Sequence, residues 1–243
     1  MGDMHESDAA GPGRPPAGVP GPLDDACLVV PLYNEGTVVA DVVKNALDTF
    51  PLVVCVDDGS ADDSAERAAD AGATVLRHAV NLGQGAALQT GIEFARTLPG
   101  VRYLVTFDAD GQHRVEDAAA MVDLARREDV AIVFGSRFLD SRTRPGTLKR
   151  IVLRTAVWFT NQSTGLRLTD AHNGLRVIRV DAARGVELRQ DRMAHASEIV
   201  LQLGRTRLPW REYPVHVLYT DYSRAKGQSL WNSVNILVDL VFK

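Results

Sequence analysis

From residue 27 onward, short apolar segments alternate with longer segments of helical pattern. The apolar segments lie at residues 27–32, 52–56, 73–76, 101–107 and 130–134. Parallel strands must be joined by crossover connections, which are usually helices, so this alternation predicts an α/β fold with a doubly wound, mostly parallel sheet. Ligands of such sheets bind at the carboxyl ends of the strands.

Polar side chains directly follow four of the five apolar segments. They are Asn34, Glu35, Asp57, Asp58, Asp108, Asp110 and Arg137. Each group alone is also typical of a helix cap or a turn. In a parallel sheet, however, the carboxyl ends of the strands meet at one edge, so the four groups would lie together. The coincidence favours a binding site over four unrelated caps.

Asp108 and Asp110 stand two positions apart at the end of an apolar segment. In an extended chain their side chains point the same way, and Gln112 and His113 follow within one turn. Hard oxygen donors suit Mg²⁺ or Mn²⁺. A solvated Asp-Ala-Asp-Gly turn is the alternative, and the companion groups at the same edge favour the metal site.

Charge and motifs disfavour several classes of function. The net charge of −4 argues against binding nucleic acid through bulk charge. The glycine-rich loop at residues 81–85 lacks the dinucleotide fingerprint and the Gly-Lys-Ser/Thr of a phosphate-binding loop, which disfavours dehydrogenases and kinases. The two cysteines, Cys27 and Cys55, lie in apolar segments and predict inert core thiols in a reducing compartment rather than a disulfide or metal pair.

The two ends of the chain differ from the segment between them. Residues 1–24 are rich in Gly, Pro, Ala and Asp and predict a disordered tail; because they lack the order of a signal peptide, we expect a cytoplasmic protein. No stretch of about twenty apolar residues occurs. Residues 230–243 form an apolar helical pattern with one polar stripe, made of Asn232, Asn235, Asp239 and Lys243. Such a helix docks on its own core, lies in a membrane surface or meets a membrane partner.

Positive charge gathers after the fifth apolar segment. The residues are Arg137, Arg142, Arg144, Lys149, Arg150 and Arg154. Arginine binds phosphate with two donors at once, and the predicted helix at 148–160 adds bulky apolar side chains, a combination that suits a lipid phosphate. A solvated basic face is the alternative.

His195 and Glu198 share one face of a later predicted helix, where a plain polar face is favoured over a metal site.

With these residues in place, residues 27–229 resemble the family 2 glycosyltransferases, in the branch of dolichol-phosphate mannose synthases and bacterial polyprenyl-phosphate sugar transferases. The segments that carry the resemblance are 30–35, 56–60, 81–86, 107–113, 135–137, 169–170, 173–176 and 222–229. The resemblance implies a nucleotide-sugar-binding domain of the GT-A type over residues 25–229, followed by an amphipathic C-terminal helix at 230–243.

The resemblance also implies roles for individual residues. The donor nucleotide sugar would be held by Pro31, Tyr33, Glu35, Asp57, Asp58, Gln84, Arg224 and Lys226. The metal, Mg²⁺ or Mn²⁺, and the donor diphosphate would be approached by Asp108, Asp110 and Gln112. The acceptor phosphate would be held by Arg137 and Arg150. Catalysis would thus depend on Asp108, Asp110 and Arg137.

We expect an inverting displacement in which a phosphate oxygen of a polyprenyl phosphate attacks the anomeric carbon of a nucleotide sugar. Such an acceptor is already anionic, so arginines that orient it would suffice. A hydroxyl acceptor would instead need a carboxylate base, and Asp170 or Glu198 would be the candidate. That alternative stays open, as does a non-catalytic nucleotide-sugar-binding scaffold.

Within the family, the chain is similar to polyprenyl-phospho-N-acetylgalactosaminyl synthases, which work beside a small membrane protein. The resemblance implies a UDP-GalNAc-like or GDP-mannose-like donor and a role in cell-envelope glycan synthesis. It also implies a peripheral protein at the inner face of the plasma membrane, held there by the membrane surface or a partner, and a homo-oligomer is compatible with it. Two departures fall on the acceptor side: Asn173-Gly-Leu-Arg176 replaces the usual Ser-Gly-Phe-Arg, and Arg154 replaces a small hydroxyl residue.

Overall fold

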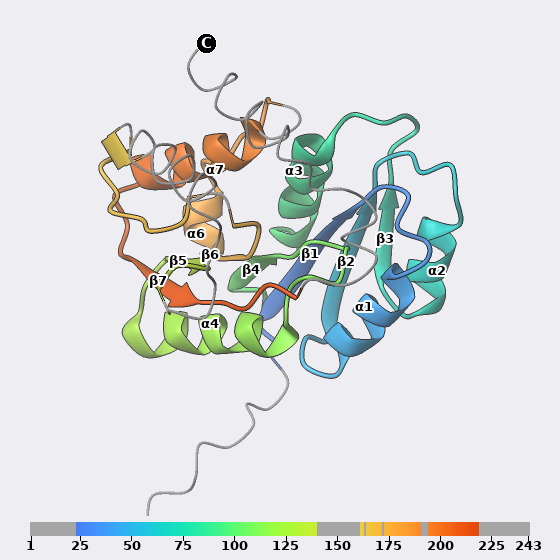
Figure 1. Cartoon of the computed structure of the whole chain (residues 1–243), viewed down its shortest axis with the longest axis horizontal. Helices are drawn as coiled ribbons and strands as arrows, with labels where there is room; N and C mark the ends of the chain where they lie inside the picture. Colours follow the sequence, from blue (N-terminus) through green and yellow to red (C-terminus); the bar gives the residue numbers. More distant parts are fainter. Residues whose placement is uncertain (1–22, 140–160, 163, 172, 191–193, 219–243) are drawn as a thin grey trace, which may run out of the picture.

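The computed structural model describes residues 23–139, 161–162, 164–171, 173–190 and 194–218 (Figure 1). These residues form a seven-stranded sheet in the order β3-β2-β1-β4-β6-β5-β7. The strands are β1 (Ala26–Leu32), β2 (Leu52–Asp57), β3 (Thr74–Arg77), β4 (Tyr103–Thr106), β5 (Ile132–Ser136), β6 (Arg176–Arg179) and β7 (Trp210–Pro214).

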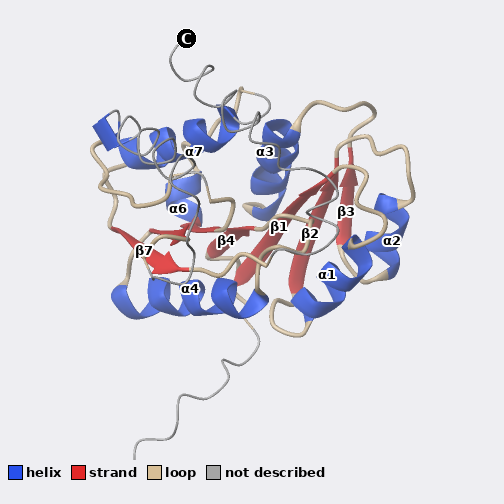
Figure 2. Ribbon diagram, viewed as in Figure 1, coloured by secondary structure: helices blue, strands red, loops and turns tan. Residues whose placement is uncertain are grey.

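Helices cover both faces of the sheet, as the alternation of segments predicts (Figure 2). They are α1 (Val39–Leu47), α2 (Ser64–Asp70), α3 (Gln84–Ala95), α4 (Val115–Glu128), α6 (Val180–Ala183) and α7 (Ala194–Arg205). One face packs against α1, α2 and α4, and the other against α3, α6 and α7. The doubly wound, mostly parallel α/β fold expected from the sequence is thereby confirmed.

β1 lies at the centre of both apolar cores. Leu28 and Val30 pack in the core under α1 and α4, whereas Cys27 and Val29 pack in the core under α3 and α7. All seven residues of the strand are buried, because successive side chains alternate between two covered faces. Full burial of one such side chain stabilises the fold by roughly 1.5–3 kcal/mol.

The two cysteines occupy opposite cores. Cys27 packs with the α3 side and Cys55 with the α1 side, and both are free and buried. Burial raises the pKa of each thiol to about 12. The prediction of inert core thiols is confirmed, since the sheet itself separates them.

β6 departs from strict alternation. It lies between β4 and β5 and runs antiparallel to both. Its first residue, Arg176, pairs with Thr106 at the end of β4 and with Phe134 near the end of β5. The chain therefore re-enters the sheet from the edge where the parallel strands end. This brings residues 173–176 to that edge.

Several expected features lie outside the described residues. They are the tail at 1–22, the basic positions Arg142, Arg144, Lys149, Arg150 and Arg154, the positions Arg224 and Lys226, and the C-terminal segment 230–243. Among the residues that are described, no helix is both long and apolar enough to cross a membrane.

Candidate active site

The carboxyl ends of β1, β2, β4 and β5 lie at one edge of the sheet, because these strands run in the same direction. The structure therefore brings together the groups of polar residues that follow them. Pro31 is buried within β1, whereas Tyr33, just beyond it, is 45% exposed. Hydrogen bonds connect the loops after β1 and β2. The backbone amide of Asn34 donates to Ser60 Oγ at 2.9 Å, and the backbone amide of Glu35 donates to Ser64 Oγ at 2.8 Å.

Asp108, just beyond β4, is surrounded by polar and cationic groups. Its Oδ2 lies 3.0 Å from Nε2 of His113, and its Oδ1 accepts a hydrogen bond from the Gln84 amide at 3.3 Å. Burial would raise the pKa of Asp108, but the hydrogen bond and charge of His113, with the charges of Arg176 and His195, hold that pKa below its usual value. Asp108 is therefore kept ionised.

Asp110 behaves differently from Asp108. Burial and the negative charge of Asp108 raise its pKa, although the backbone amide of Gln112 donates to its Oδ1 at 3.0 Å. Two neighbouring carboxylates, one of which resists ionisation, form an environment that a divalent cation would stabilise.

The donor set at this edge fits a hard divalent cation that also binds substrate. In the described parts of the chain, no group of three or more His, Cys, Asp or Glu side chains is arranged to hold a metal ion. Mg²⁺ is commonly bound by one or two carboxylates together with substrate phosphates and water. Asp108 and Asp110 supply that pair. Gln112, the third expected ligand, has a mostly buried side chain, and its contribution stays a prediction.

The neighbouring carboxylates Asp57 and Asp58, at the end of β2, have different partners. The Oδ1 of Asp57 accepts from the Ser60 backbone amide at 3.3 Å, and its buried Oδ2 forms an ion pair with Arg77, 3.4 Å away, and no hydrogen bond with any described residue. Asp58 accepts hydrogen bonds from the backbone amides of Leu82 and Gly83 at 2.9 and 2.8 Å, and its Oδ1 lies 2.8 Å from Nδ1 of His78. Both carboxylates are buried, and the contact with the nucleoside expected of each stays a prediction.

Arg137, after β5, is held by Asp170. Its Nε and one terminal nitrogen donate to the two carboxylate oxygens at 2.6 and 2.9 Å, and its backbone amide adds a third bond at 3.1 Å. Asp170 is 2% exposed. Its own backbone amide, and both the amide and hydroxyl of Thr169, donate to Glu212 Oε1 on β7. Arg137 is therefore fixed by a chain of contacts from the edge strand.

Asp170 and Glu198, the two carboxylates that were candidates for a base, both accept hydrogen bonds from the protein. Both oxygens of Asp170 accept from Arg137. Glu198, on α7, accepts from the backbone amides of Arg189 and Gln190 at 3.0 and 2.9 Å. Their observed contacts position a neighbouring side chain and a loop.

Arg176 and Gly174 belong to the site but had no role assigned from sequence. Arg176 is 2% exposed, and burial lowers its pKa to about 10 against the opposing effect of Asp108 and Asp170. One terminal nitrogen of its guanidinium has no hydrogen-bond partner among the described residues. Gly174 lies so close to Asp108 that an added Cβ would be 2.3 Å from its Oδ2. Both residues belong to the motif at 173–176, which was their one signal in the sequence. Their position in the site follows from the antiparallel course of β6, which no local pattern specifies.

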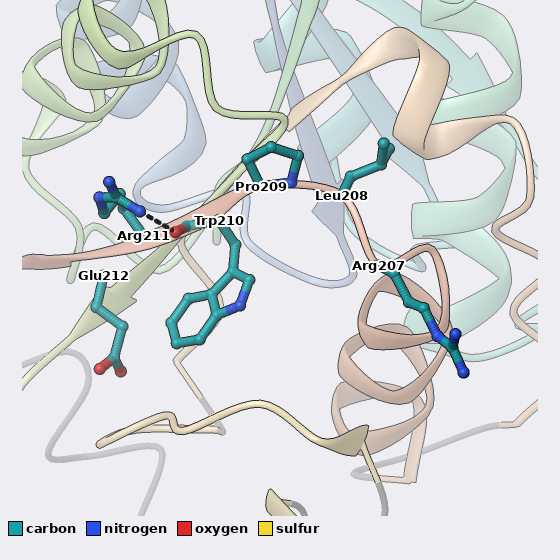
Figure 3. Close-up of a pocket in the computed structure, with 6 residues that line it drawn as sticks. All are labelled: Arg207, Leu208, Pro209, Trp210, Arg211 and Glu212. Carbon is teal, nitrogen blue, oxygen red and sulfur yellow. Dashed lines mark hydrogen bonds between the residues drawn. The ribbon is translucent and has the colours of Figure 1, made fainter.

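An open cavity of about 530 Å³ lies elsewhere, where the chain enters β7 (Figure 3). It is lined by Arg207, Leu208, Pro209, Trp210, Arg211 and Glu212. The Trp210 ring packs edge-on against Phe134, and Arg211 pairs with Glu128. Apart from Glu212, none of these residues belongs to the polar groups that follow β1, β2, β4 and β5, so this cavity is not the candidate active site.

The chain is similar to the crystal structure of glucosyl-3-phosphoglycerate synthase from Mycobacterium tuberculosis with Mn²⁺ and UDP-glucose, with a TM-score of 0.61 and 16% identity over 90% of this chain and 78% of that one. At that identity the likeness concerns the fold alone.

Two sequence relatives extend over most of the chain. An uncharacterized protein of Methanocaldococcus jannaschii is 33% identical, covering 90% of this chain and 92% of its own. The UDP-N-acetylglucosamine–dolichyl-phosphate N-acetylglucosaminyltransferase of Methanococcus voltae is 28% identical, covering 88% and 94%. Residues 27–186, more than half of the sequence, match the model of glycosyl transferase family 2, and the chain therefore belongs to that family.

Proposed function

We propose that this family 2 glycosyltransferase moves a sugar from a nucleoside diphosphate sugar to the phosphate of a polyprenyl phosphate, with inversion at the anomeric carbon. The observation that carries the proposal is the commitment of Asp170 to Arg137. The carboxylate that a hydroxyl acceptor would need as a base serves instead to fix an arginine at the active edge. The relative from M. voltae, named for a dolichyl-phosphate acceptor, supports the same class of acceptor.

On the donor side, Tyr33 and Glu35 hold the nucleoside together with Asp57 and Asp58, and Asp108 and Asp110 receive the diphosphate. The hydrogen bonds that tie the loops after β1 and β2 to each other support this assignment, because they bring these residues together on the edge of the sheet. Asp108 and Asp110 would hold a divalent cation, Mg²⁺ or Mn²⁺, which would supply positive charge against the departing diphosphate. The Mn²⁺ and UDP-glucose in the structural neighbour are consistent with this chemistry.

On the acceptor side, Arg137 binds the lipid phosphate and aligns it. A lone pair of a phosphate oxygen forms the new bond to the anomeric carbon, while the bond to the nucleoside diphosphate breaks and its electrons leave with that group. No proton has to be removed, because the phosphate is already ionised near neutral pH. Orientation by a fixed guanidinium supplies the main assistance, and Arg150, outside the described residues, is the second proposed contact.

We further propose that residues 230–243 hold the enzyme at the inner face of the plasma membrane, either in the lipid surface or on a small membrane partner. The polar stripe on an otherwise apolar helical pattern supports this. The donor is proposed to be a UDP- or GDP-sugar, with UDP tested first because the M. voltae relative is named for UDP-N-acetylglucosamine and the structural neighbour holds UDP-glucose.

The test is a transfer assay with labelled UDP- and GDP-sugars, Mg²⁺ or Mn²⁺ and a polyprenyl phosphate, followed by extraction into organic solvent. We expect label in the organic phase with the wild type and none with Asp110→Asn. Asp70→Asn, on the exposed surface of α2, is the matched control and should transfer normally. Label that stays in the aqueous phase with every donor, although the protein is folded and binds nucleotide, would overturn the lipid acceptor.

A further inference from the structure

Residues 186–190 connect α6 to α7 and belong to no helix or strand. Within this connection, the side chains of Val186 and Leu188 pack in the core beneath α3 and α7. Its backbone is bonded to Gln89 of α3, whose side-chain nitrogen donates to the Val186 carbonyl at 3.3 Å and whose oxygen accepts from the Leu188 amide at 2.9 Å. A carboxamide offers the same donor and acceptor as a peptide group, so Gln89 takes the place of a neighbouring strand.

The connection is also held by α7. The side chain of Gln202 accepts from the Glu187 amide and donates to the Glu187 carbonyl, both at 2.7 Å. Oε2 of Glu198 then accepts from two consecutive backbone amides, those of Arg189 and Gln190, at 3.0 and 2.9 Å. Consecutive N–H groups that converge on one point form an anion-binding concavity, which the Glu198 carboxylate fills. Three side chains from two helices therefore hold the backbone of five consecutive residues.

The end of the connection lies against the donor side of the site. A Cβ on Gly85 would be 2.4 Å from the carbonyl oxygen of Gln190 and 2.9 Å from Cβ of His195. Gly85 follows Gln84, whose side-chain amide donates to Asp108 at 3.3 Å, and the charge of His195 helps to lower the pKa of Asp108. Because the donor diphosphate is proposed to lie at Asp108, a sugar joined to that diphosphate would come close to the end of the connection.

The connection is bonded more extensively than a surface loop requires. Loops are in general more mobile than the elements that they join, and fixing three long polar side chains costs conformational entropy. A fixed backbone suits a sugar site, because sugars that differ in one hydroxyl are told apart by polar groups held in place.

We propose that Gln89, Glu198 and Gln202 are positioning residues that hold the connection 186–190 as a preformed wall beside the donor sugar, and that this wall sets which sugar is accepted. The sugar preference rests on the proposed function. The shape of the connection does not, and it can be measured on the protein without any ligand.

The first test is hydrogen exchange in the ligand-free protein. Glu198→Ala removes the acceptor of the Arg189 and Gln190 amides while leaving a residue that favours a helix in α7. We expect exchange at these two amides to accelerate at least about tenfold, because each loses a bond to a charged group. Glu187→Ala is the matched control. It removes a carboxylate from the same connection, but that carboxylate pairs only with the exposed side chain of Arg189, so exchange should stay near wild type.

The distribution of the effect decides the outcome of this test. Acceleration confined to the connection is expected. Unchanged exchange at the two amides, or equal acceleration throughout α7, would overturn the positioning role of Glu198.

The second test compares the binding of UDP with that of UDP-N-acetylglucosamine, and of GDP with that of GDP-mannose, each with Mn²⁺, by calorimetry. In Glu198→Ala, we expect the dissociation constant of the sugar nucleotide that the wild type binds to rise about tenfold. The dissociation constant of the matching nucleoside diphosphate should stay within about twofold of wild type. Gln202→Ala should act in the same direction, since it releases the same connection, and Glu187→Ala should match the wild type with both ligands.

The two ligands of each pair separate the possible roles of Glu198. Equal loss of affinity for the nucleoside diphosphate and the sugar nucleotide would show that the wall does not bound the sugar, and would overturn the proposal. Unchanged affinity for both with a lower kcat would instead favour Glu198 as a base and overturn it as well. If the wild type binds none of the four nucleotides, the proposed function is contradicted, and the exchange rates still decide whether Glu198 holds the connection.

Discussion

The donor side and the acceptor side of the strand edge hold their charged groups differently. On the donor side, Asp57 and Asp58 follow β2 and Asp108 follows β4, and the hydrogen-bond partners of all three lie within 25 residues along the chain. On the acceptor side, Arg137 depends on Asp170, 33 residues away, which in turn depends on Glu212, 42 residues further. The donor side is built from neighbouring units, and the acceptor side from contacts between distant segments. We therefore expect perturbations to spread less from the donor side than from the acceptor side.

The largest effect should come where the two sides touch. Gly174→Ala would place a Cβ 2.3 Å from Oδ2 of Asp108, so the carboxylate must move. A displacement of about 1 Å at reacting groups costs on the order of 100-fold in rate, and we expect at least that loss in kcat with the thermal midpoint nearly unchanged. Gly185→Ala, where a Cβ meets nothing within 4 Å, is the control. Normal turnover in Gly174→Ala would mean that Asp108 is not fixed as the structure shows.

Gly91→Ala tests the packing beneath the donor side. Helix α3 approaches β1 so closely that a Cβ on Gly91 would lie 2.3 Å from Cγ1 of Val29. Overpacking of this kind destabilises a core by about 1–3 kcal/mol, which urea unfolding would measure. Since the strain lies in the core, we expect the KM for the acceptor to be unchanged. A shift in acceptor KM would show that the two sides are coupled through the sheet.

Arg137→Lys tests the acceptor side alone. A lysine cannot reproduce the two parallel bonds to Asp170, and it presents a single point charge to a phosphate. We expect the KM for polyprenyl phosphate to rise about tenfold, with nucleotide affinity unchanged in a calorimetric titration. Arg211→Lys, in the exposed pair with Glu128, should change neither quantity. An equal loss of donor affinity would contradict the separation of the two sides.

The smallest expected effect concerns Glu212 and pH. Burial raises the pKa of Glu212 above its ordinary value of 4.5, although bonds from Thr169 and Asp170 oppose the shift. A raised pKa in the folded state contributes stability below the unfolded value, which is lost as pH rises through the folded value. The free energy of unfolding of the wild type should therefore fall, relative to Glu212→Gln, as pH rises from 4.5. Parallel pH profiles for the two proteins would remove this residue from the acceptor-side chain of contacts.

The same division explains how far the sequence predicts the site. Asp57, Asp108 and Asp110 were predictable at the edge because local alternation sets both the strand direction and the strand end. Asn34 and Glu35 followed from the same rule. These positions depend on short stretches of chain whose pattern is visible without the rest of the fold.

The sequence did not predict the partner of Arg137 or the burial of Arg176. Both depend on β6 entering between β4 and β5 in the reverse direction, and no local pattern near residue 176 specifies which strands it will join. Asp170 was noticed only as a possible base, because its pairing with Arg137 arises after 33 residues of intervening chain. The hydrogen bonds that Asp58 and Glu198 accept likewise come from backbone amides of other loops. Every residue except proline has such an amide, so these donors cannot be recognised in the sequence.

The placement of the cysteines gives each layer of the molecule its own reporter. Cys27 lies in the core beneath α3, Cys55 lies in the core beneath α1 and α2, and their burial keeps both thiols protonated in the native state. Each can react with an alkylating reagent only when its own helical layer lifts from the sheet. The chain therefore carries two native chemical labels, one per layer, with which the order in which the layers open can be timed without introducing a foreign group.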